Sequence, residues 1–253
     1  MIELQRGAER QGESLDKFVR RMQHYVNVSD DDLNVLCSLK HSVQTFSSGQ
    51  TIVSLNEPVE KLYVMEAGWS LRARYLEDGR RQIINFQLPG DYFDLMSLVG
   101  ARSDHTVSAA TDVRMRVFQG RDFLNAIQQS PRLAAAFWWV TVQEETILRQ
   151  QIVRIGRMSA RERIANFILE LNRRQNIADG DRDDFVPLPV PQAFLADALG
   201  LSVVHISRSL TTLKAKNLLR TSRRGIEIID REGLMELAEY SPDLLEATPV
   251  TLS

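Results

Sequence analysis

The chain has 253 residues, of which 43% are hydrophobic and 25% charged, so it can build one large or two modest domains and is too apolar for wholesale disorder. The formal net charge of -2 excludes a general polycation, so nucleic-acid binding would have to come from a local basic patch. The single cysteine, Cys37, excludes an intrachain disulfide framework and a cysteine-only metal or iron–sulfur site.

The first 28 residues form an N-terminal extension, in which charges stand where a signal peptide needs an apolar core. The most apolar run of the chain, "LAAAFWWVTV", is about half the roughly 20 residues of a membrane-spanning helix. We therefore expect a soluble cytoplasmic protein with no membrane partner. A helix should begin after Ser29, with Leu33, Leu36 and Cys37 on one apolar side. A cysteine on that side is expected to be buried and inert.

Residues 29–130 are predicted to form a β-roll domain. The short β-prone runs "TIVSL", "KLYVMEA", "SLRARYL" and "QIINFQL" are separated by turn signals, and "EDGRR" predicts a hairpin loop. Strands at this spacing are typical of a compact barrel or roll. A metal-dependent enzyme on such a roll would need several histidines, but His105 is the only one between Phe46 and Phe118, so we predict no enzyme.

Residues 131–157 are predicted to form a long helix, after a short helix that ends near Pro131. Six residues are spaced alternately four and three apart along it: Leu133, Phe137, Val140, Glu144, Ile147 and Gln151. One interpretation is a two-helix dimer interface in which the two polar residues fix the register. The other is a helix that lies on its own β-domain. The dimer interface is the prediction carried forward.

Residues 158–240 are predicted to form a second domain. "SARE" is a capping box of Ser159 and Glu162, and Ile164, Phe167, Ile168 and Leu171 mark the buried face of the helix that follows. The acidic stretch "NIADGDRDDF", which begins at Asn176, is expected to be a loop. "VPLPVP" then predicts a short extended piece.

The stretch "PQAFLADALGLSVVHISRSLTTLKAKNLL" predicts a helix-turn-helix. Gly200 ends the first helix and Ser202 caps the second, at 203–218, which turns Ile206, Leu210 and Leu213 inward. Its outward residues are Val203, Val204, His205, Ser207, Arg208, Thr211 and Thr212. "LLRTSRRGIEIID" predicts two strands of a basic hairpin wing. Six basic residues and no acidic residue lie between positions 198 and 226. Helix-turn-helix pairs also occur as packing corners, but this basic wing favours DNA.

The order of β-roll, long helix and winged helix-turn-helix resembles the CRP/FNR transcription regulators. The motifs "FSSGQTI", "LYVMEAGW", "LPGDYF" and "LADALGLSVVHISRSLTTLKAKNLL" carry the resemblance, which covers about Leu33 to Leu237. It implies an α+β chain with a cyclic-nucleotide-binding-like roll at 29–130 that senses an effector, a dimerisation helix and a winged helix-turn-helix. It also implies a homodimer that binds double-stranded DNA at an inverted repeat and, in an activator, contacts RNA polymerase. The residues beyond 240 form a C-terminal tail, 241–253.

The resemblance also implies which residues read DNA. The oxygen-sensing members carry a Glu-x-x-Ser-Arg pattern in the second helix, and Ser207 and Arg208 match its end while Val204 replaces the glutamate. Arg208 is expected to donate to guanine, and Val203 and Val204 to meet thymine methyl groups. His205 is expected to contact a base edge or a phosphate. We count Ser202 with this set and expect Gln192, Arg223 and Arg224 to hold phosphates.

The stretch "GDYFDLMSLVGARSDHTVSAAT", residues 90–111, keeps the outline of a nucleotide pocket without its chemistry. In cyclic-nucleotide-binding members a glutamate contacts the ribose and an arginine ten residues later pairs with the phosphate. Here Leu95 and His105 stand at these positions, with Thr106 next and Arg102 in the loop. A buried phosphate needs a guanidinium or equivalent donors. Cyclic AMP and cyclic GMP are therefore not expected to bind.

No cofactor is predicted. The cysteine count excludes the iron–sulfur cluster of the oxygen sensors, and haem on His41 or His105 is not favoured because a lone histidine is more often structural. The effector stays unidentified, and the protein could also be constitutively active. The alternative function is a ligand-sensing regulatory subunit that acts through protein partners. A surface loop of the cAMP-responsive relative touches RNA polymerase, and residues 176–186 lie at the matching place.

Overall fold

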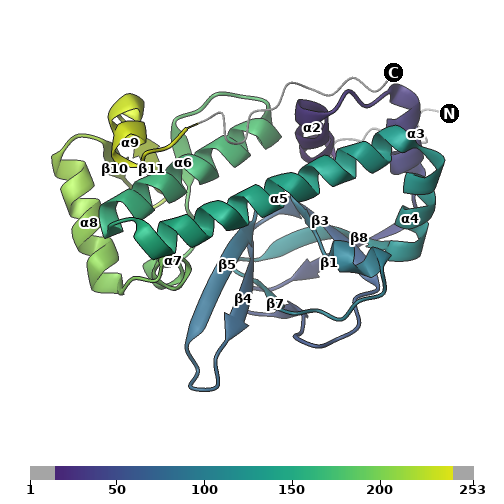
Figure 1. Cartoon of the computed structure of the whole chain (residues 1–253), viewed down its shortest axis with the longest axis horizontal. Helices are drawn as coiled ribbons and strands as arrows, with labels where there is room; N and C mark the ends of the chain where they lie inside the picture. The colour runs from purple at the N-terminus through teal and green to yellow at the C-terminus, as the bar shows by residue number, and fades with distance from the viewer. Residues whose placement is uncertain (1–14, 242–253) are drawn as a thin grey trace.

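The computed structural model describes residues 15–241, so the start of the predicted extension and the tail after Ser241 lie outside the described residues. A single long helix, α5 (Pro131–Arg157), runs along the length of the molecule (Figure 1). Helices α2, α3 and α4 lie near one end of α5, and α7, α8 and α9 lie near the other. The strands of the roll lie on one side of α5, and this helix contacts both the roll and the C-terminal part.

Two helices precede the roll. Helix α2 (Asp16–Tyr25) was not predicted, yet Phe18, Met22 and Tyr25 bury one face of it in the core shared with α5. Helix α3 (Asp30–Ser38) begins at the predicted Ser29 cap. The prediction that Cys37 is buried was wrong. Leu36 occupies the core position of α3, and the next residue around the helix faces solvent.

The roll consists of two four-stranded antiparallel sheets, in the orders β1-β8-β3-β6 and β2-β7-β4-β5. Their inner faces enclose an apolar core that includes Met65, Phe93, Val107 and Met115. The elements are β1 (His41–Phe46), β2 (Thr51–Val53), β3 (Lys61–Ala67), β4 (Ser70–Tyr75), β5 (Arg81–Gln87), β6 (Tyr92–Phe93), the short 3-10 helix η1 (Leu95–Leu98), β7 (Thr106–Ala109) and β8 (Val113–Gln119). The predicted hairpin joins β4 to β5.

Helix α4 (Gly120–Gln129) leads into α5, whose first turn contains Pro131 and is capped by the Ser130 side chain. Helix α6 (Ala160–Asp179) begins at the predicted capping box of Ser159 and Glu162. It ends at Gly180, which has a φ of 71°, a conformation that glycine adopts without strain. The predicted loop from Asn176 therefore begins four residues later, because 176–179 complete the last turn of α6.

The C-terminal part is a winged helix-turn-helix. It contains β9 (Phe185–Pro187), α7 (Gln192–Leu199), α8 (Val203–Ala215), β10 (Leu219–Thr221), β11 (Gly225–Ile228) and α9 (Arg231–Leu237). The wing strands pair as predicted, and β9 adds a third strand against β11. Helix α8 ends at Ala215 rather than at the predicted residue 218, because the chain turns at Asn217 with a φ of 58°. This architecture confirms the predicted α+β fold class.

A buried polar network lies where the roll meets the C-terminal part. The Arg154 side chain on α5 donates to Asn166, Gln151 and Glu170, and only 2% of it is exposed. Glu170 also pairs with Arg174, which in turn reaches Asp91 in the turn before β6. We call this chain of contacts the junction network. It satisfies the buried charges by pairing them, as burial at low dielectric requires.

Candidate nucleic-acid interface

Helix α8 turns its two sides to different environments. Ile206, Leu210 and Leu213 are buried against the core of the C-terminal part, as predicted. Val203 is 46% exposed and Val204 is 57% exposed, although both are apolar. The remaining predicted DNA-binding residues, in α7, α8 and the wing, are also exposed: Gln192, Ser202, His205, Ser207, Arg208, Arg223 and Arg224. The N-terminal half of α8 thus offers both methyl groups and hydrogen-bonding groups to a partner.

Arg208 makes no side-chain hydrogen bond or ion pair with any residue in the described part of the chain, which leaves its guanidinium available. Arg220 differs, because its Nη1 atom lies 2.8 Å from Oε2 of Glu227 on the neighbouring strand. The Ser222 hydroxyl accepts hydrogen bonds from the backbone N–H groups of Arg224 and Gly225, which fixes the turn of the wing. Arg223 and Arg224 therefore project from a defined turn.

The start of α8 is positioned by contacts with α7, α5, α6 and the roll. The Ser202 hydroxyl accepts from the backbone N–H of His205 at 3.2 Å and caps α8. The carbonyl oxygen of Ala198, at the end of α7, accepts from the side-chain amides of Gln82 on β5 and Gln151 on α5. Arg163 donates to the next carbonyl, that of Leu199, at 2.9 Å. Sequence reasoning missed these supports, because side-chain to backbone contacts across long separations leave no pattern in the chain.

An ion pair also joins the roll to α7. The guanidinium of Arg81 on β5 lies 2.6 Å from Asp197 and 4.4 Å from the ring centroid of Phe194. Both partners belong to the first helix of the helix-turn-helix. The orientation of α8 therefore depends on the β4–β5 hairpin as well as on its own domain.

The predicted interface residues of α5 pack against other parts of the same chain. Leu133, Phe137, Val140, Ile147 and Gln151 are buried inside a single chain, with at most 7% of each exposed. Glu144 lies 3.6 Å from Arg72 of β4. These six residues pack α5 against α2, the roll and α7, which corrects the predicted seam in favour of the alternative that α5 lies on its own β-domain.

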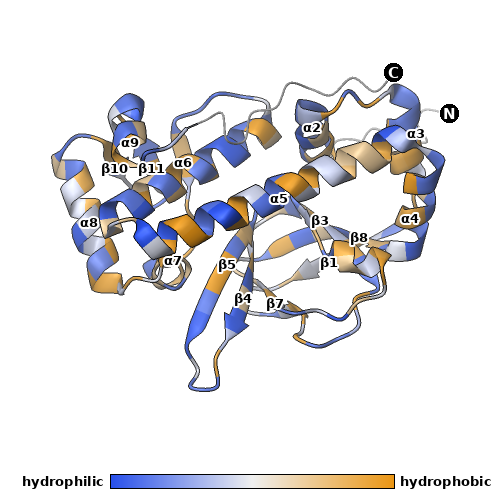
Figure 2. Cartoon of the chain, viewed as in Figure 1, coloured by the Kyte–Doolittle hydropathy of each residue, from blue (hydrophilic) through white to orange (hydrophobic). Residues whose placement is uncertain are grey.

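The opposite face of α5 is exposed and carries large apolar side chains. Trp138 is 75% exposed, Ile152 is 67% exposed and Val153 is 47% exposed. Trp138, Glu145 and Ile152 recur at intervals of seven residues, which places them on one line along the helix. Figure 2 shows hydrophobic and hydrophilic residues alternating along α5. Because Phe137 and Val140 are buried while Trp138 and Ile152 are exposed, both faces of this helix contain apolar residues.

In the roll, His105 is buried and bonded to acidic side chains. Its Nε2 atom lies 3.2 Å from Oδ1 of Asp94, and its Nδ1 atom lies 2.6 Å from Oδ1 of Asp104. The contact with His105 lowers the pKa of Asp104. Asp94 is 2% exposed and has a φ of 68°, an uncommon conformation for a residue with a side chain. The position predicted for a phosphate partner is thus engaged within the chain.

The other predicted pocket residues are dispersed. Arg102 is exposed, and its Nη1 atom donates to the backbone carbonyl of Asn56 at 2.7 Å. It therefore points away from the roll interior. Leu95 begins η1 and packs with the core shared by α2 and α5, and Thr106 lies in β7. The structure brings Leu95 and His105 near each other through Asp94 and leaves Arg102 outside.

Within residues 15–241, no group of three or more histidine, cysteine, aspartate or glutamate side chains could hold a metal ion. No single helix in that range is long and apolar enough to cross a membrane. Helices α7 and α8 meet that criterion only when taken together, and the two are bent by 99°.

Two family models match the chain. The cyclic nucleotide-binding domain matches residues 43–130, and the Crp-like helix-turn-helix domain matches residues 162–237. The first match covers the roll and α4, and the second covers α6 to α9. The two matches therefore follow the division seen in the structure.

Curated relatives and solved structures match over most of the chain. The nitrogen fixation regulation protein FixK of Bradyrhizobium diazoefficiens is 33% identical over 76% of this chain and 80% of its own length. The transcriptional activator protein FnrL of Cereibacter sphaeroides is 26% identical over 84% of this chain and 86% of its own. The structure of FixK2 from Bradyrhizobium japonicum matches with a TM-score of 0.72 and 29% identity, over 80% of this chain and 100% of that one.

Proposed function

The chain belongs to the CRP/FNR family of DNA-binding transcription regulators, and from this premise we propose that it reads an inverted-repeat DNA site as a homodimer. Regulators of this family bind DNA and act as dimers. The matched relatives are transcription regulators, which supports DNA rather than a protein partner as the target. We propose further that this chain has no enzymatic activity and works in the cytoplasm.

The observation that carries the proposal is the exposed surface of α8 and of the wing turn, where no acidic residue lies between positions 198 and 226. Helix α8 enters the major groove, where Arg208 donates two hydrogen bonds to O6 and N7 of guanine. Val203 and Val204 meet thymine methyl groups, because an apolar side chain cannot accept the hydrogen bond of a cytosine amino group. Ser207 and His205 contact base edges or phosphates beside them.

The phosphate contacts come from the surroundings of α8. Gln192 and Ser202 stand at the starts of α7 and α8, where backbone N–H groups favour an anion. Arg223 and Arg224 project from the fixed turn of the wing and hold a neighbouring phosphate. These contacts set the position of α8 in the groove, and the base contacts set the sequence.

The dimer forms through the exposed face of α5, in place of the buried face that the heptad spacing suggested. Two copies of Trp138 and Ile152 bury each other, and Glu145 between them fixes the register. This face meets the requirement that the interface be apolar, exposed in one chain and in line along one helix. The two α8 helices then meet DNA half-sites about one turn, roughly 34 Å, apart.

The test combines selection of DNA from a random pool with disruption of the α5 face. The wild-type protein should enrich an inverted repeat and scatter light as a dimer. The double substitution Trp138→Asp and Ile152→Asp should give a monomer, because four charges cannot be desolvated in one seam. Val99→Asp is the matched control, since Val99 is 79% exposed in a loop of the roll. A dimeric double variant, or a pool with no inverted repeat, would contradict the proposal.

For RNA polymerase, we propose the loop 180–184 between α6 and β9 as the contact of an activator. Asn172 and Asn176 on α6 donate to the backbone carbonyl of Asp183, so the loop backbone is held from α6. Asp181, Arg182 and Asp183 are exposed there. This arrangement suits a contact surface, because its side chains are available and its backbone is held.

We propose that the effector of this protein is not a cyclic nucleotide. A cyclic phosphate would meet the acidic side chain of Asp94 and the His105 ring where it needs a guanidinium. Neither haem nor another metal cofactor is proposed. Control by a different ligand, or constitutive DNA binding, is compatible with this arrangement.

A further inference from the structure

Helix α2 precedes the roll in the sequence, yet it packs against elements of both halves of the chain. It lies along α6 and α5 and also reaches β3 of the roll. Phe18, Met22 and Tyr25 anchor it in the core shared with α5. Because α6 leads into the winged helix-turn-helix, α2 is placed where it can fix the C-terminal part against the roll.

One buried carboxylate joins α2, the roll and α6. The guanidinium group of Arg21 on α2 pairs with Asp91, in the turn before β6, and only 5% of Arg21 is exposed. Asp91 also pairs with Arg174 on α6 and accepts from the backbone N–H of Leu88 at 2.8 Å. Arg21 therefore extends the junction network to α2. Buried charges that share a partner resist separation, because each would be left uncompensated at low dielectric.

The outer side of α2 contacts the last turn of α6. The Nζ atom of Lys17 lies 2.5 Å from Oδ1 of Asp179, and Nη1 of Arg20 donates to the backbone carbonyl of Asp179 at 3.0 Å. These contacts are exposed, and each stabilises the fold only weakly. Both cations lie at the carbonyl end of α6, where the helix dipole favours positive charge. Together they determine which turn of α2 meets the end of α6.

The backbone of the roll comes close to both helices at the same point. Gly90, next to Asp91, has a φ of 93°, and a Cβ atom there would lie 3.1 Å from Cβ of Lys17 and 3.2 Å from Cβ of Ala178 on α6. The turn therefore fits between α2 and α6 without a side chain. A rotation of α6 against the roll would have to break this packing and the Asp91 ion pairs together.

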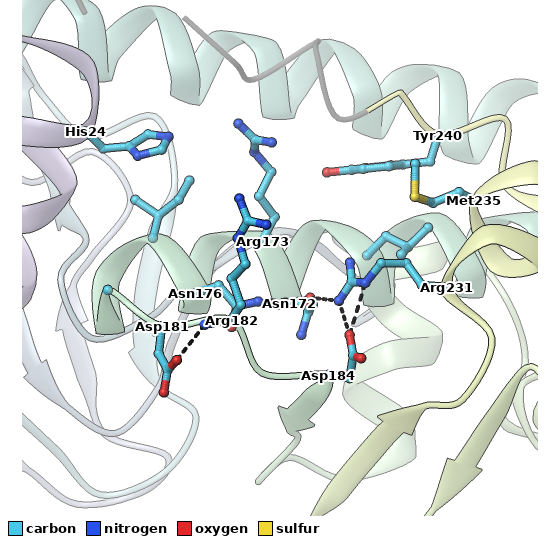
Figure 3. A pocket seen from close by; sticks show the side chains of 13 residues that line it. His24, Asn172, Arg173, Asn176, Asp181, Arg182, Asp184, Arg231, Met235 and Tyr240 are labelled. Carbon is cyan, nitrogen blue, oxygen red and sulfur yellow. Dashed lines mark hydrogen bonds and ion pairs between the residues drawn. The ribbon is translucent and has the colours of Figure 1, made fainter.

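A cavity of about 830 Å³ separates α2 from α9. Figure 3 shows His24 of α2 on one side of this cavity, and Met235 of α9 with Tyr240 on the other. The influence of α2 on the winged helix-turn-helix is therefore exerted through α6, at its C-terminal end.

We propose that α2 is a clamp that holds α6 at one angle to the roll and thereby sets the separation of the two α8 helices in the dimer. Arg21 is the positioning residue of this clamp, and Lys17 and Arg20 set the register of α2 on α6. The effect on the separation of the α8 helices rests on the proposed function, whereas the effect on the contact between the roll and α6 does not.

The central variant is Arg21→Met, which keeps a long side chain in the core and leaves Asp91 with its other partner on α6. Arg121→Met is the matched control, because Arg121 is an exposed arginine on α4. Circular dichroism and light scattering check that both variants fold and keep the wild-type oligomeric state. If Arg21→Met does not fold, the double substitution Lys17→Ala and Arg20→Ala takes its place, because it removes only exposed contacts.

The clamp is first measured without DNA, by hydrogen exchange of backbone amides. Relative to the amides of β8, those of Leu88 and of the last turn of α6 should exchange at least about threefold faster in Arg21→Met than in the wild type, because release of the clamp opens these contacts locally. The control variant should show wild-type rates. Equal acceleration over the whole chain, or none, would overturn the clamp, because a local release predicts neither.

The consequence for DNA is read from the spacing of the half-sites in the selected inverted repeat. Insertion of one base pair between them should weaken wild-type binding at least about tenfold, because it shifts and rotates one half-site against a fixed pair of α8 helices. In Arg21→Met this loss should fall to about threefold or less, because the C-terminal parts can then adjust to a new separation. The Arg121→Met control should keep the wild-type loss.

The two experiments separate the clamp from the proposed function. A loss on insertion that stays at the wild-type value in Arg21→Met would contradict the clamp while leaving DNA binding by the dimer intact. A wild-type protein that binds no inverted repeat would contradict the proposed function, and hydrogen exchange alone would then decide whether α2 clamps α6 to the roll.

Discussion

Helix α8 and the pocket stretch of the roll use their polar side chains in opposite ways. On α8, Arg208 has no partner within the described chain, and Val203 and Val204 are exposed although they are apolar. In the roll, His105 is buried and both of its ring nitrogens meet acidic side chains. A surface that leaves its groups unsatisfied is prepared for a partner, because binding supplies contacts that the free chain lacks. A pocket whose polar groups already bond to each other offers a ligand no unsatisfied group of this kind.

The same contrast divides the two faces of α5. The face that contains Phe137 and Val140 is buried in the core of the same chain, and the face that contains Trp138 and Ile152 is exposed to solvent. The junction network lies at the buried side of this helix and joins the roll to the C-terminal part. Three predictions test whether satisfied and unsatisfied groups differ in this way, beginning with the largest expected effect.

Arg154→Ala should lower the free energy of unfolding by about 3–5 kcal/mol, because Glu170 and the Asn166 amide would lose a buried, charged partner. Guanidinium titration at a fixed protein concentration measures the change, since a dimer's stability depends on concentration. The matched control is Arg80→Ala in the loop between β4 and β5, whose exposed ion pair with Asp78 lies outside the proposed dimer interface, with an expected cost below about 1 kcal/mol. Equal costs for the two variants would show that the junction network is not structural.

Arg208→Ala should weaken binding to the selected site by about 1–3 kcal/mol and change binding to random DNA little, because the bidentate guanine contact exists only at the specific site. Arg223→Ala is the matched control from the wing. It should weaken binding to both DNAs alike and reduce the slope of log affinity against log salt concentration by about one, because one phosphate contact is lost. Fluorescence anisotropy at several salt concentrations separates the two. If Arg208→Ala weakens both DNAs equally, Arg208 contacts a phosphate and the proposed readout fails.

Local signals in the sequence predicted the DNA-binding part well. Gly200 and Ser202 fix the end of one helix and the start of the next, and the structure has both at those positions. The capping box at Ser159 was equally clear. These predictions succeed because caps and turns depend on one or two residues and their immediate backbone.

Predictions failed where a feature depends on distant residues. The orientation of α5 could not be read from spacing, since apolar residues lie on both faces and only the position of the roll decides between them. Asp94, which contacts His105, has a positive φ, and nothing in the neighbouring sequence indicates this conformation. Helix α2 did carry a signal: Phe18, Met22 and Tyr25 are spaced four and three apart.

The smallest expected effect is that of cyclic AMP on the roll. At 1 mM ligand, a site with a micromolar dissociation constant would stabilise the fold by about 4 kcal/mol, and a millimolar site by only about 0.4 kcal/mol. For a chain of this size the weaker case corresponds to a rise in Tm of about 1 °C.

We expect a rise in Tm no larger than this with cyclic AMP. Leu95 offers no polar group to a ribose, Arg102 points away from the roll interior, and Asp94 and His105 are bonded to each other. Thermal unfolding with cyclic AMP, and with the selected DNA as a positive control, measures the difference. A rise of several degrees with the nucleotide would show that the roll rearranges to open its pocket, and the contrast with α8 would then hold only for the unliganded protein.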